Sequence, residues 1–328
     1  MRPNSGHPGW AGSVASIGGT LIVGGYRIAS PTDPMTTGSV WSSSDGKSWA
    51  VKELAPGEGL TVVADGTHAL AVSAHHAWTS TDGRDWVAAA APSDTPTGVV
   101  VALPSGGFLA SATTADTSVC SLWFTHDGSA WAKRSSPNHG ACPSGLAAGP
   151  DGLVAAGLLD VGHGWLSFSA DLGVSWKTEV SGRPSVFTSL AAVNGGFLAT
   201  TKTYGPSGPV RGETWRSSDG RSWDRVGTFG TRQFYEVNQL RSIVRFGGRY
   251  LAFGYSAGID DTIAEARIST TGAVWGPAPW GKDRYSIDLY AATVWKSRIV
   301  VVGQSDNYIS IGDEPVTKNV LVFIGRSG

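Results

Sequence analysis

A short pattern that recurs along the chain constrains the fold more than any other feature. Each full copy begins and ends with tryptophan and carries an Asp-Gly pair, as in Trp41–Trp49 (WSSSDGKSW). Asp and Gly favour tight turns and tryptophan favours strands, so each copy is predicted to be a strand end, a polar turn and a strand start. The other copies are Trp78–Trp86, Trp123–Trp131, Trp215–Trp223, Ser169–Trp176 with one more residue in the turn, and Ser269–Trp275 without the aspartate.

The spacing of the copies is typical of a blade repeat. Their last tryptophans, at positions 49, 86, 131, 176, 223 and 275, are separated by 37, 45, 45, 47 and 52 residues by subtraction. Propeller blades of four strands repeat every ~40–50 residues. Within each unit a glycine-containing hairpin precedes a short apolar run, which indicates buried strands, and no stretch has a sustained helical period.

The sequence therefore predicts an all-β fold, one seven-bladed β-propeller with four-stranded antiparallel blades. The seventh unit stops before its fourth strand, and the first residues of the chain are placed to supply that strand. We expect the N- and C-terminal strands to pair and close the ring, because this removes an exposed sheet edge. The predicted blades are residues 10–55, 56–93, 94–137, 138–182, 183–230, 231–281 and 282–328.

Composition excludes several classes of function. With 41% hydrophobic and 16% charged residues, the 328-residue chain is expected to fold rather than remain disordered. Its net charge of −1 gives no basic surface for nucleic acid. No apolar run is long enough to span a bilayer, and the N-terminus lacks the apolar segment of an export signal. We expect a monomer that binds a small molecule, a glycan or a protein, without a cofactor or metal.

The recurring pattern resembles the Asp-box (BNR) repeat, SxDxGxxW, of sialidase and sortilin-like propellers. Ser169–Trp176 (SADLGVSW) matches this repeat in full, and the other copies are similar to a version shortened by one residue. The resemblance covers nearly the whole chain and implies the propeller fold. It implies little about function, because the same fold carries many functions.

The aspartates of the boxes are interpreted as structural. Each carboxylate is expected to accept backbone N–H groups across its turn, while glycine takes the positive φ and the tryptophan packs between its sheet and the next. A repeated ligand or calcium site is the alternative, and single carboxylates lack the ligand count that calcium needs. The box aspartates are Asp45, Asp82, Asp127, Asp171 and Asp219.

Function is expected on the face opposite the box turns, where long, irregular loops lie over a rigid scaffold. Glu236 and Asp288 are catalytic candidates near the axis, because two carboxylates about 5–10 Å apart can cleave a glycoside. Four histidines on this face either form a metal or acid–base cluster or are ordinary exposed side chains. The ligand-binding candidates are Tyr26, Arg27, Glu58, His75, His76, His139, Asp160, His163, Tyr204, Arg211, Tyr235 and Tyr285.

The two cysteines bear on the cellular compartment. Cys120 and Cys142 belong to adjacent units on the same predicted face, so they are expected to form a disulfide, with two buried thiols as the alternative. A disulfide favours an oxidising compartment. We therefore expect the protein outside the cell or in the cell envelope, with the cytoplasm left open.

Three classes of function remain open. The first is a ligand- or protein-binding propeller, similar to non-enzymatic sortilin-like and assembly-factor relatives. The second is a carbohydrate-active hydrolase or lyase with an axial site, and the third is another small-molecule enzyme on this scaffold.

Two features of the sialidase pattern are met only in part. Tyr26-Arg27-Ile28-Ala29 is similar to the FRIP-type motif of sialidases but lacks its proline. The pattern also pairs a tyrosine nucleophile with a glutamate, but Tyr235 and Glu236 are adjacent, so in a strand their side chains point in opposite directions. Sialidase activity is therefore not expected.

Overall fold

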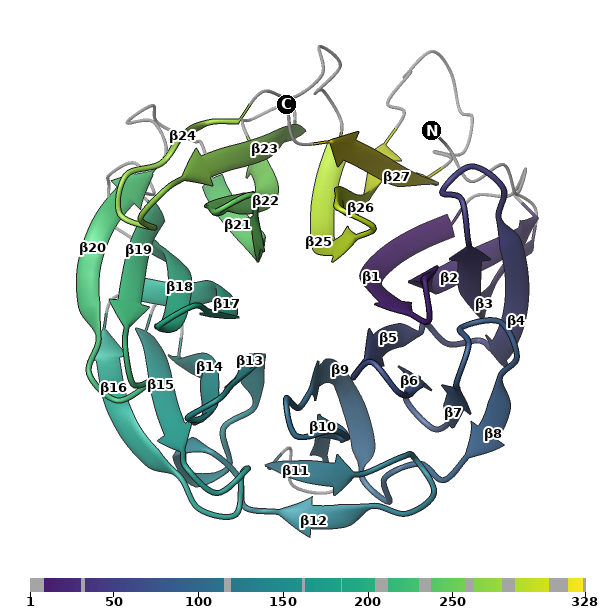
Figure 1. Ribbon diagram of the computed structural model, residues 1–328. Coiled ribbons are helices and arrows are strands. Elements are labelled where there is room, and N and C mark those ends of the chain that lie inside the picture. Colours follow the sequence, from purple (N-terminus) through teal and green to yellow (C-terminus); the bar gives the residue numbers. More distant parts are fainter. Residues whose placement is uncertain are drawn as a thin grey trace.

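The computed structural model is a ring of seven antiparallel sheets around a central axis (Figure 1). Six sheets have four strands, and the seventh has three within the described residues. The predicted seven-bladed β-propeller is therefore confirmed. Residues 1–8, the predicted fourth strand of the last blade, lie outside the described residues, so the pairing of the terminal strands stays a prediction. The structure describes residues 9–30, 33–114, 119–160, 163–183, 185–203, 212–229, 237–257, 262–278, 287–306 and 318–326.

The strands of each blade follow the chain from the axis outward. Blades 1 to 3 contain β1 (Gly9–Ile17), β2 (Thr20–Ser30), β3 (Asp33–Ser43), β4 (Ala50–Pro56), β5 (Thr61–Ala64), β6 (Ala69–Val72), β7 (Ala77–Ser80), β8 (Val87–Ala89), β9 (Thr95–Ala102), β10 (Phe108–Thr113), β11 (Cys120–Thr125) and β12 (Ala132–Arg134). Blades 4 and 5 contain β13 (Pro143–Gly149), β14 (Gly152–Asp160), β15 (His163–Ser169), β16 (Lys177–Arg183), β17 (Ser185–Val193), β18 (Gly196–Thr203), β19 (Gly212–Ser217) and β20 (Asp224–Phe229). Blades 6 and 7 contain β21 (Val237–Phe246), β22 (Arg249–Ala257), β23 (Thr262–Ser269), β24 (Gly276–Pro277), β25 (Ile287–Trp295), β26 (Arg298–Asp306) and β27 (Lys318–Arg326).

Helical structure is nearly absent from the described part of the chain. It contains one short 3-10 turn, Asn138–Gly140, which precedes blade 4. None of the described residues forms a helix that is long and apolar enough to cross a membrane.

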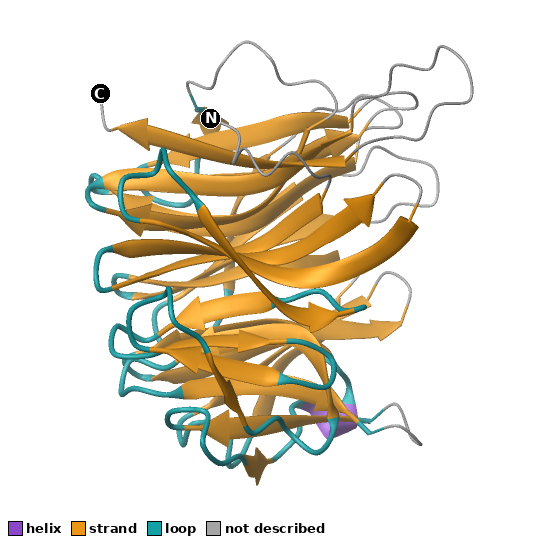
Figure 2. Cartoon of the chain, turned by 90° about the vertical axis from the view of Figure 1, so that its right-hand side faces the viewer, coloured by secondary structure: helices purple, strands orange, loops and turns teal. Residues whose placement is uncertain are grey.

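Antiparallel order gives the ring two different faces. The tight hairpins between the first and second strands and the turns between the third and fourth strands lie together on one side, visible as short loops in Figure 2. We call this side the box face. The connections between the second and third strands, and those between blades, lie on the opposite side, which we call the loop face.

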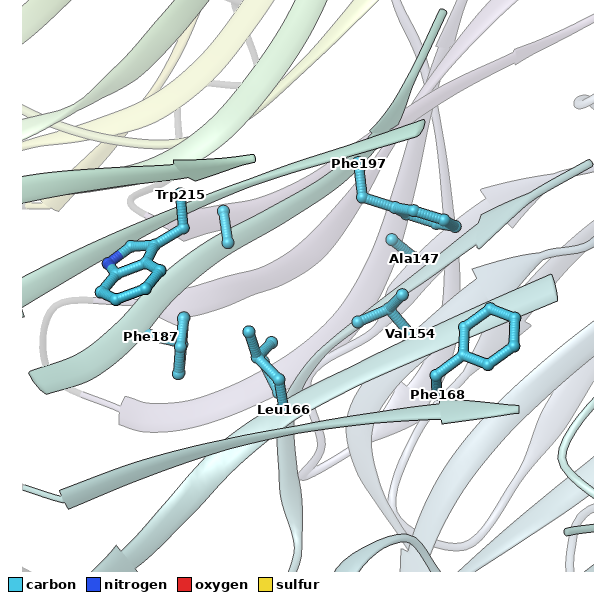
Figure 3. Close-up of a cluster of buried hydrophobic side chains, with 9 residues drawn as sticks. Ala147, Val154, Leu166, Phe168, Phe187, Phe197 and Trp215 are labelled. Atoms are coloured by element: carbon cyan, nitrogen blue, oxygen red, sulfur yellow. The ribbon is translucent and has the colours of Figure 1, made fainter. Parts of the chain in front are cut away.

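The apolar core is divided into clusters that lie between blades. In the described residues, seven such clusters occupy the seven blade interfaces. Between blades 4 and 5, Leu166 and Phe168 face Phe187, Phe197 and Trp215 (Figure 3). Burying large side chains of this kind contributes roughly 1.5–3 kcal/mol each. The blades therefore stabilise one another, and a single blade would leave both of its apolar faces in water.

The first and last blades close the ring by the same kind of packing. Trp295 and Val300 of blade 7 share a buried cluster with Leu21 and Trp41 of blade 1. The indole N–H of Trp295 also donates to the backbone oxygen of Gly19 at 2.9 Å. Closure within the described residues thus rests on sheet packing.

The box turns are held by hydrogen bonds within each turn. In blade 5, the Asp219 carboxylate accepts the backbone N–H groups of Arg221 at 2.8 Å and Ser222 at 2.9 Å. The Ser217 hydroxyl donates to the same carboxylate and accepts the N–H of Gly220. Gly220 has a φ of 78°, and a Cβ there would lie 2.5 Å from Phe168 of the preceding blade. Glycine is thus required both by the turn and by the close contact between blades.

Equivalent bonds hold the other acidic boxes. In the fourth box, the hydroxyl and the backbone N–H of Ser175 lower the pKa of Asp171 to about 2. Because the folded pKa lies below the unfolded value of about 4, the carboxylate stabilises the fold above that pH. This contribution is lost as the pH falls to about 2.

Each box tryptophan packs on the blade that precedes its own, which corrects the expectation that it packs on the next sheet. The indole N–H of Trp131 in blade 3 donates to the oxygen of Ala90 in blade 2 at 2.7 Å. Trp176 in blade 4 likewise donates to Ser135 in blade 3 at 3.1 Å. The twist of each sheet brings its outer turn over the preceding blade.

The predicted disulfide is present. Cys120 begins β11 in blade 3, and Cys142 lies just before β13 in blade 4, with an S–S distance of 2.00 Å. The bond joins two adjacent blades at the loop face, and the alternative of two free thiols is excluded.

The structural role of the box carboxylate can be tested by removing the carboxylate from one box and by adding one to the box that lacks it. Asp219→Ala is expected to lower the free energy of unfolding by about 1 kcal/mol, because two backbone N–H groups lose their acceptor. In the sixth box Thr271 accepts the N–H of Ala273 at 3.2 Å. Thr271→Asp should raise stability by a similar amount, because a carboxylate forms stronger bonds with these N–H groups. Chemical denaturation measures both changes, and unchanged midpoints in both variants would contradict the structural role.

Candidate functional site

A row of aromatic and charged side chains crosses blades 1, 7 and 6 at the loop-face ends of their strands. Trp10 of β1 stacks on Tyr26 of β2 with ring centroids 5.8 Å apart, and meets Tyr290 of β25 edge-on at 5.5 Å. The guanidinium carbon of Arg241 in β21 lies 4.7 Å from the ring centroids of both Tyr290 and Tyr255. We call these five residues the aromatic stack. It connects three blades along the inner strands.

Bulges in the inner strands explain how Arg241 and Tyr290 meet. In five blades the first strand has one extra residue at an equivalent position, which disturbs the pairing with the second strand. The extra residue is small in blades 1, 4 and 5, and it is arginine in blade 6 and tyrosine in blade 7. The extra residues are Gly12, Ser144, Thr188, Arg241 and Tyr290.

The sequence analysis did not identify Trp10 or Tyr290, and it gave Arg241 no place in the fold. A signal was present in the inner strands, where Leu240-Arg241-Ser242 aligns with Leu289-Tyr290-Ala291. A large side chain between a buried leucine and a small residue marks the bulge. A bulge interrupts the two-residue alternation that identifies strand faces, and this interruption hides the signal in the sequence.

Arg241 is oriented by aromatic rings. Its Nη2 donates to the hydroxyl of Tyr255 at 3.4 Å, and that hydroxyl donates to the Gln239 side-chain oxygen at 2.9 Å. Among the described residues no carboxylate lies within ion-pair distance of Arg241. A guanidinium between two rings gains cation–π energy and loses little further freedom when it binds an anion.

Tyr290 is held in its protonated form. Its hydroxyl donates to Asp288 at 3.2 Å. Burial and the negative charge of Asp288 raise the pKa of Tyr290 to about 12, against the opposing effect of the Arg241 charge. At neutral pH the side chain is therefore a neutral phenol, with Asp288 beside it as hydrogen-bond acceptor.

A carboxylate–imidazole group lies beside the stack, between blades 1 and 2. Glu58 Oε1 is 2.6 Å from His75 Nδ1, and its Oε2 is 3.8 Å from His76 Nδ1. Burial alone would raise the pKa of Glu58, but hydrogen bonds with Ser73 and His75 outweigh it and hold the pKa below its usual value. The neighbouring residue Gly59 packs beside the Tyr26 ring, so this group borders the end of the stack.

Other predicted site residues make contacts within their own blades. Arg27 pairs with Glu53 at 2.6 Å, and His163 pairs with Asp160 at 2.5 Å. His139 lies in the 3-10 turn with a φ of 55°. Within the described ranges, no three His, Cys, Asp or Glu side chains converge as a metal ion would require.

The structure thus brings together two groups of predicted residues. Tyr26 and Asp288 belong to or border the stack, and Glu58, His75 and His76 form the adjoining group. Five predicted residues lie outside the described residues, and the proposed pairing of Asp288 with one of them stays a prediction. They are Tyr204, Arg211, Tyr235, Glu236 and Tyr285.

Comparison with known proteins supports the fold. No protein-family model and no curated protein matches the chain. Virginiamycin B lyase from Staphylococcus aureus is similar in structure, with a TM-score of 0.62, 11% identity, and coverage of 92% of this chain and 93% of that one. The WD40 β-propeller domain of Doa1 has a TM-score of 0.60 at 12% identity, covering 98% and 95%.

A sialidase is also similar, over part of its length. Trypanosoma rangeli sialidase has a TM-score of 0.50 at 12% identity, and the match covers 97% of this chain and 54% of that one. The chain therefore spans about half of that enzyme. At such low identities these likenesses show only the β-propeller fold, so the function has to be inferred from the residues of the site.

Replacing Tyr290 by phenylalanine tests the environment of the stack. The folded pKa of about 12 lies above the unfolded value of about 10. The contribution of neutral Tyr290 to the free energy of unfolding is therefore fully present below pH ~10, and it is lost as the pH rises towards ~12. Melting temperatures between pH 9 and 12 should fall more steeply in the wild type than in Tyr290→Phe, and the wild type should show one additional late step in tyrosinate absorbance. Parallel curves for the two proteins would contradict this assignment.

Proposed function

We propose that this protein is a binding propeller that holds a small ring-shaped ligand with a carboxylate over the aromatic stack. The contact that carries the proposal is the Arg241 guanidinium between the rings of Tyr255 and Tyr290. Aromatic faces suit the apolar face of a sugar or a planar ring, and arginine binds a carboxylate through two parallel hydrogen bonds. The ligand class is therefore a sugar acid or a comparable cyclic acid.

The proton state of Tyr290 favours binding over sialidase-type catalysis. In the sialidase pattern a tyrosine acts as nucleophile beside a carboxylate. Here the pKa of Tyr290 is raised and its hydroxyl donates to Asp288. Such a tyrosine remains a neutral phenol, and its ring, stacked against Arg241, contributes an aromatic face to the binding site.

We also assign the chain to the Asp-box type of propeller and to an oxidising compartment. The hydrogen-bonded turns around residues such as Asp45 and Asp82 support the first assignment. The bond between Cys120 and Cys142 supports the second, because disulfides persist outside the reducing cytosol.

Arg241→Ala tests the binding proposal. We expect glucuronate and N-acetylneuraminate, but not glucose, to raise the melting temperature of the wild type, since a ligand at 100 times its Kd adds about 2.7 kcal/mol. Arg241→Ala should lose this shift, and Arg241→Lys should retain little of it, because lysine lacks the planar fork. Arg225→Ala is the matched control, since Arg225 pairs with Glu213 on the outer part of blade 5. Equal shifts with glucose, or a full shift in Arg241→Ala, would exclude the proposal.

A second candidate, acid–base catalysis on a sugar, rests on the bond of 2.6 Å between Glu58 and His75. A carboxylate that holds one ring nitrogen of histidine leaves the other available for proton transfer. The test is lyase activity on uronate oligosaccharides, followed by ultraviolet absorbance of the unsaturated product. If His75 is the base, His75→Ala should abolish turnover and leave glucuronate binding intact. No turnover by the wild type would leave binding as the function.

A further inference from the structure

Two grooves of similar composition lie on the outer rim at the box face, away from the aromatic stack. The first has a volume of about 510 Å³ and lies between blades 1 and 2. Its lining includes Trp49, Lys52, Arg84, Asp85 and Trp86.

The second groove has a volume of about 320 Å³ and lies between blades 4 and 5. Its lining includes Phe168, Trp176, Lys177, Glu179 and Arg221. Each groove thus combines aromatic rings, two cations and one carboxylate.

The position of one box residue accounts for the likeness of the grooves. Arg84 and Arg221 both follow the box glycine directly, and each lines a groove together with the box tryptophan of the preceding blade. The corresponding residues in the first, third, fourth and sixth boxes are Lys47, Ser129, Val174 and Ala273. Among the six boxes, arginine therefore occupies this position at two separate interfaces.

Within the described residues the box carboxylates form no ion pair with these arginines, although the charge of Arg84 helps to lower the pKa of Asp82. Asp82 and Asp219 are engaged with backbone N–H groups of their own turns. No ion pair within the described residues involves Arg84 or Arg221. Arg221 lies across the Phe168 ring, with 4.8 Å from the guanidinium carbon to the centroid. This ring holds the guanidinium at the groove with its hydrogen-bond donors unused by any carboxylate.

Charge favours an anionic occupant of both grooves. The first groove is lined by two cations, Lys52 and Arg84, and one carboxylate, Asp85, so its net charge is positive. The second groove is also lined by two cations and one carboxylate. In the second groove Lys177 pairs with Glu179 at 3.2 Å, which leaves the charge of Arg221 uncompensated. An aromatic wall beside an unpaired guanidinium suits a pyranose ring that carries a carboxylate.

We propose that these two grooves bind uronic acid units of an acidic polysaccharide. Tryptophan contacts the apolar face of a sugar ring, and Arg84 or Arg221 pairs with its carboxylate. One polymer that occupies both grooves gains avidity, so that individually weak contacts add to firm attachment. This surface is separate from the aromatic stack, and the proposal does not depend on the function of the stack.

The test is the affinity of the intact protein for immobilised polygalacturonate, with dextran as the neutral polymer. The wild type should bind polygalacturonate and not dextran. A lost bidentate contact should weaken binding about 10-fold in Arg84→Ala and in Arg221→Ala, and about 100-fold in the double variant. Lys47→Ala is the matched control, because Lys47 is the cation at the same box position in blade 1; it should stay within about 2-fold of the wild type. Melting curves establish that each variant is folded.

Two further comparisons distinguish specific binding in the grooves from nonspecific electrostatic attraction to the protein surface. Replacing both arginines by lysine keeps the charge but removes the planar fork, so it should still weaken binding about 10-fold. The loss of affinity caused by the Arg84 and Arg221 substitutions should be equally large in an Arg241→Ala background, and these substitutions should leave glucuronate binding at the stack unchanged. Wild-type affinity in either double variant, equal binding of dextran, or disappearance of the Arg84 and Arg221 effects in the Arg241→Ala background would overturn the proposal.

Discussion

The packing of each sheet against its neighbour is the interaction on which the whole structure depends. In the described residues the apolar side chains gather between blades, so a blade becomes stable only when it is flanked by others. Hydroxyl groups reinforce these contacts near the axis, where Ser13 accepts the N–H of Val62 from blade 2 and Thr200 donates to Leu240 of blade 6. Contact of Trp295 with Leu21 joins the last blade to the first, so within the described residues their facing apolar surfaces cover each other.

A repeated scaffold acquires function where one unit departs from the others. The inner-strand bulge is occupied by a small residue such as Thr188 in some blades, but by Arg241 and Tyr290 in two that are adjacent. The fold therefore places a cation against an aromatic ring without any motif that is local in the sequence. The same reasoning applies at the rim, where Arg84 and Arg221 occupy a box position that holds other residues, such as Ser129 and Ala273, in other boxes. In both places the backbone supplies equivalent positions, and the side chains supply the chemistry.

The candidate site could be predicted in part. Strand order alone indicated that Tyr26 and Asp288 lie towards the loop face, since antiparallel blades alternate their connections between two faces. The same reasoning placed both Glu58 and His75 on the loop face, and the structure added that the two side chains are bonded. The sequence also proposed Arg27 as a ligand-binding residue, whereas its guanidinium pairs with a carboxylate of its own blade. A sequence shows which loops share a face but not which partner a long side chain chooses.

By itself the sequence determined the number of blades and the box turns, and it favoured a disulfide between Cys120 and Cys142 over two buried thiols, which the structure then decided. These features depend on local turn chemistry and on regular spacing, both of which can be read along the chain. Tertiary structure alone decided that the box tryptophans pack on the preceding blade and that Trp10, Tyr290 and Arg241 form one row. The reason is physical: sheet twist and strand bulges set the direction of a side chain in space, and both are fixed only when the blades pack together.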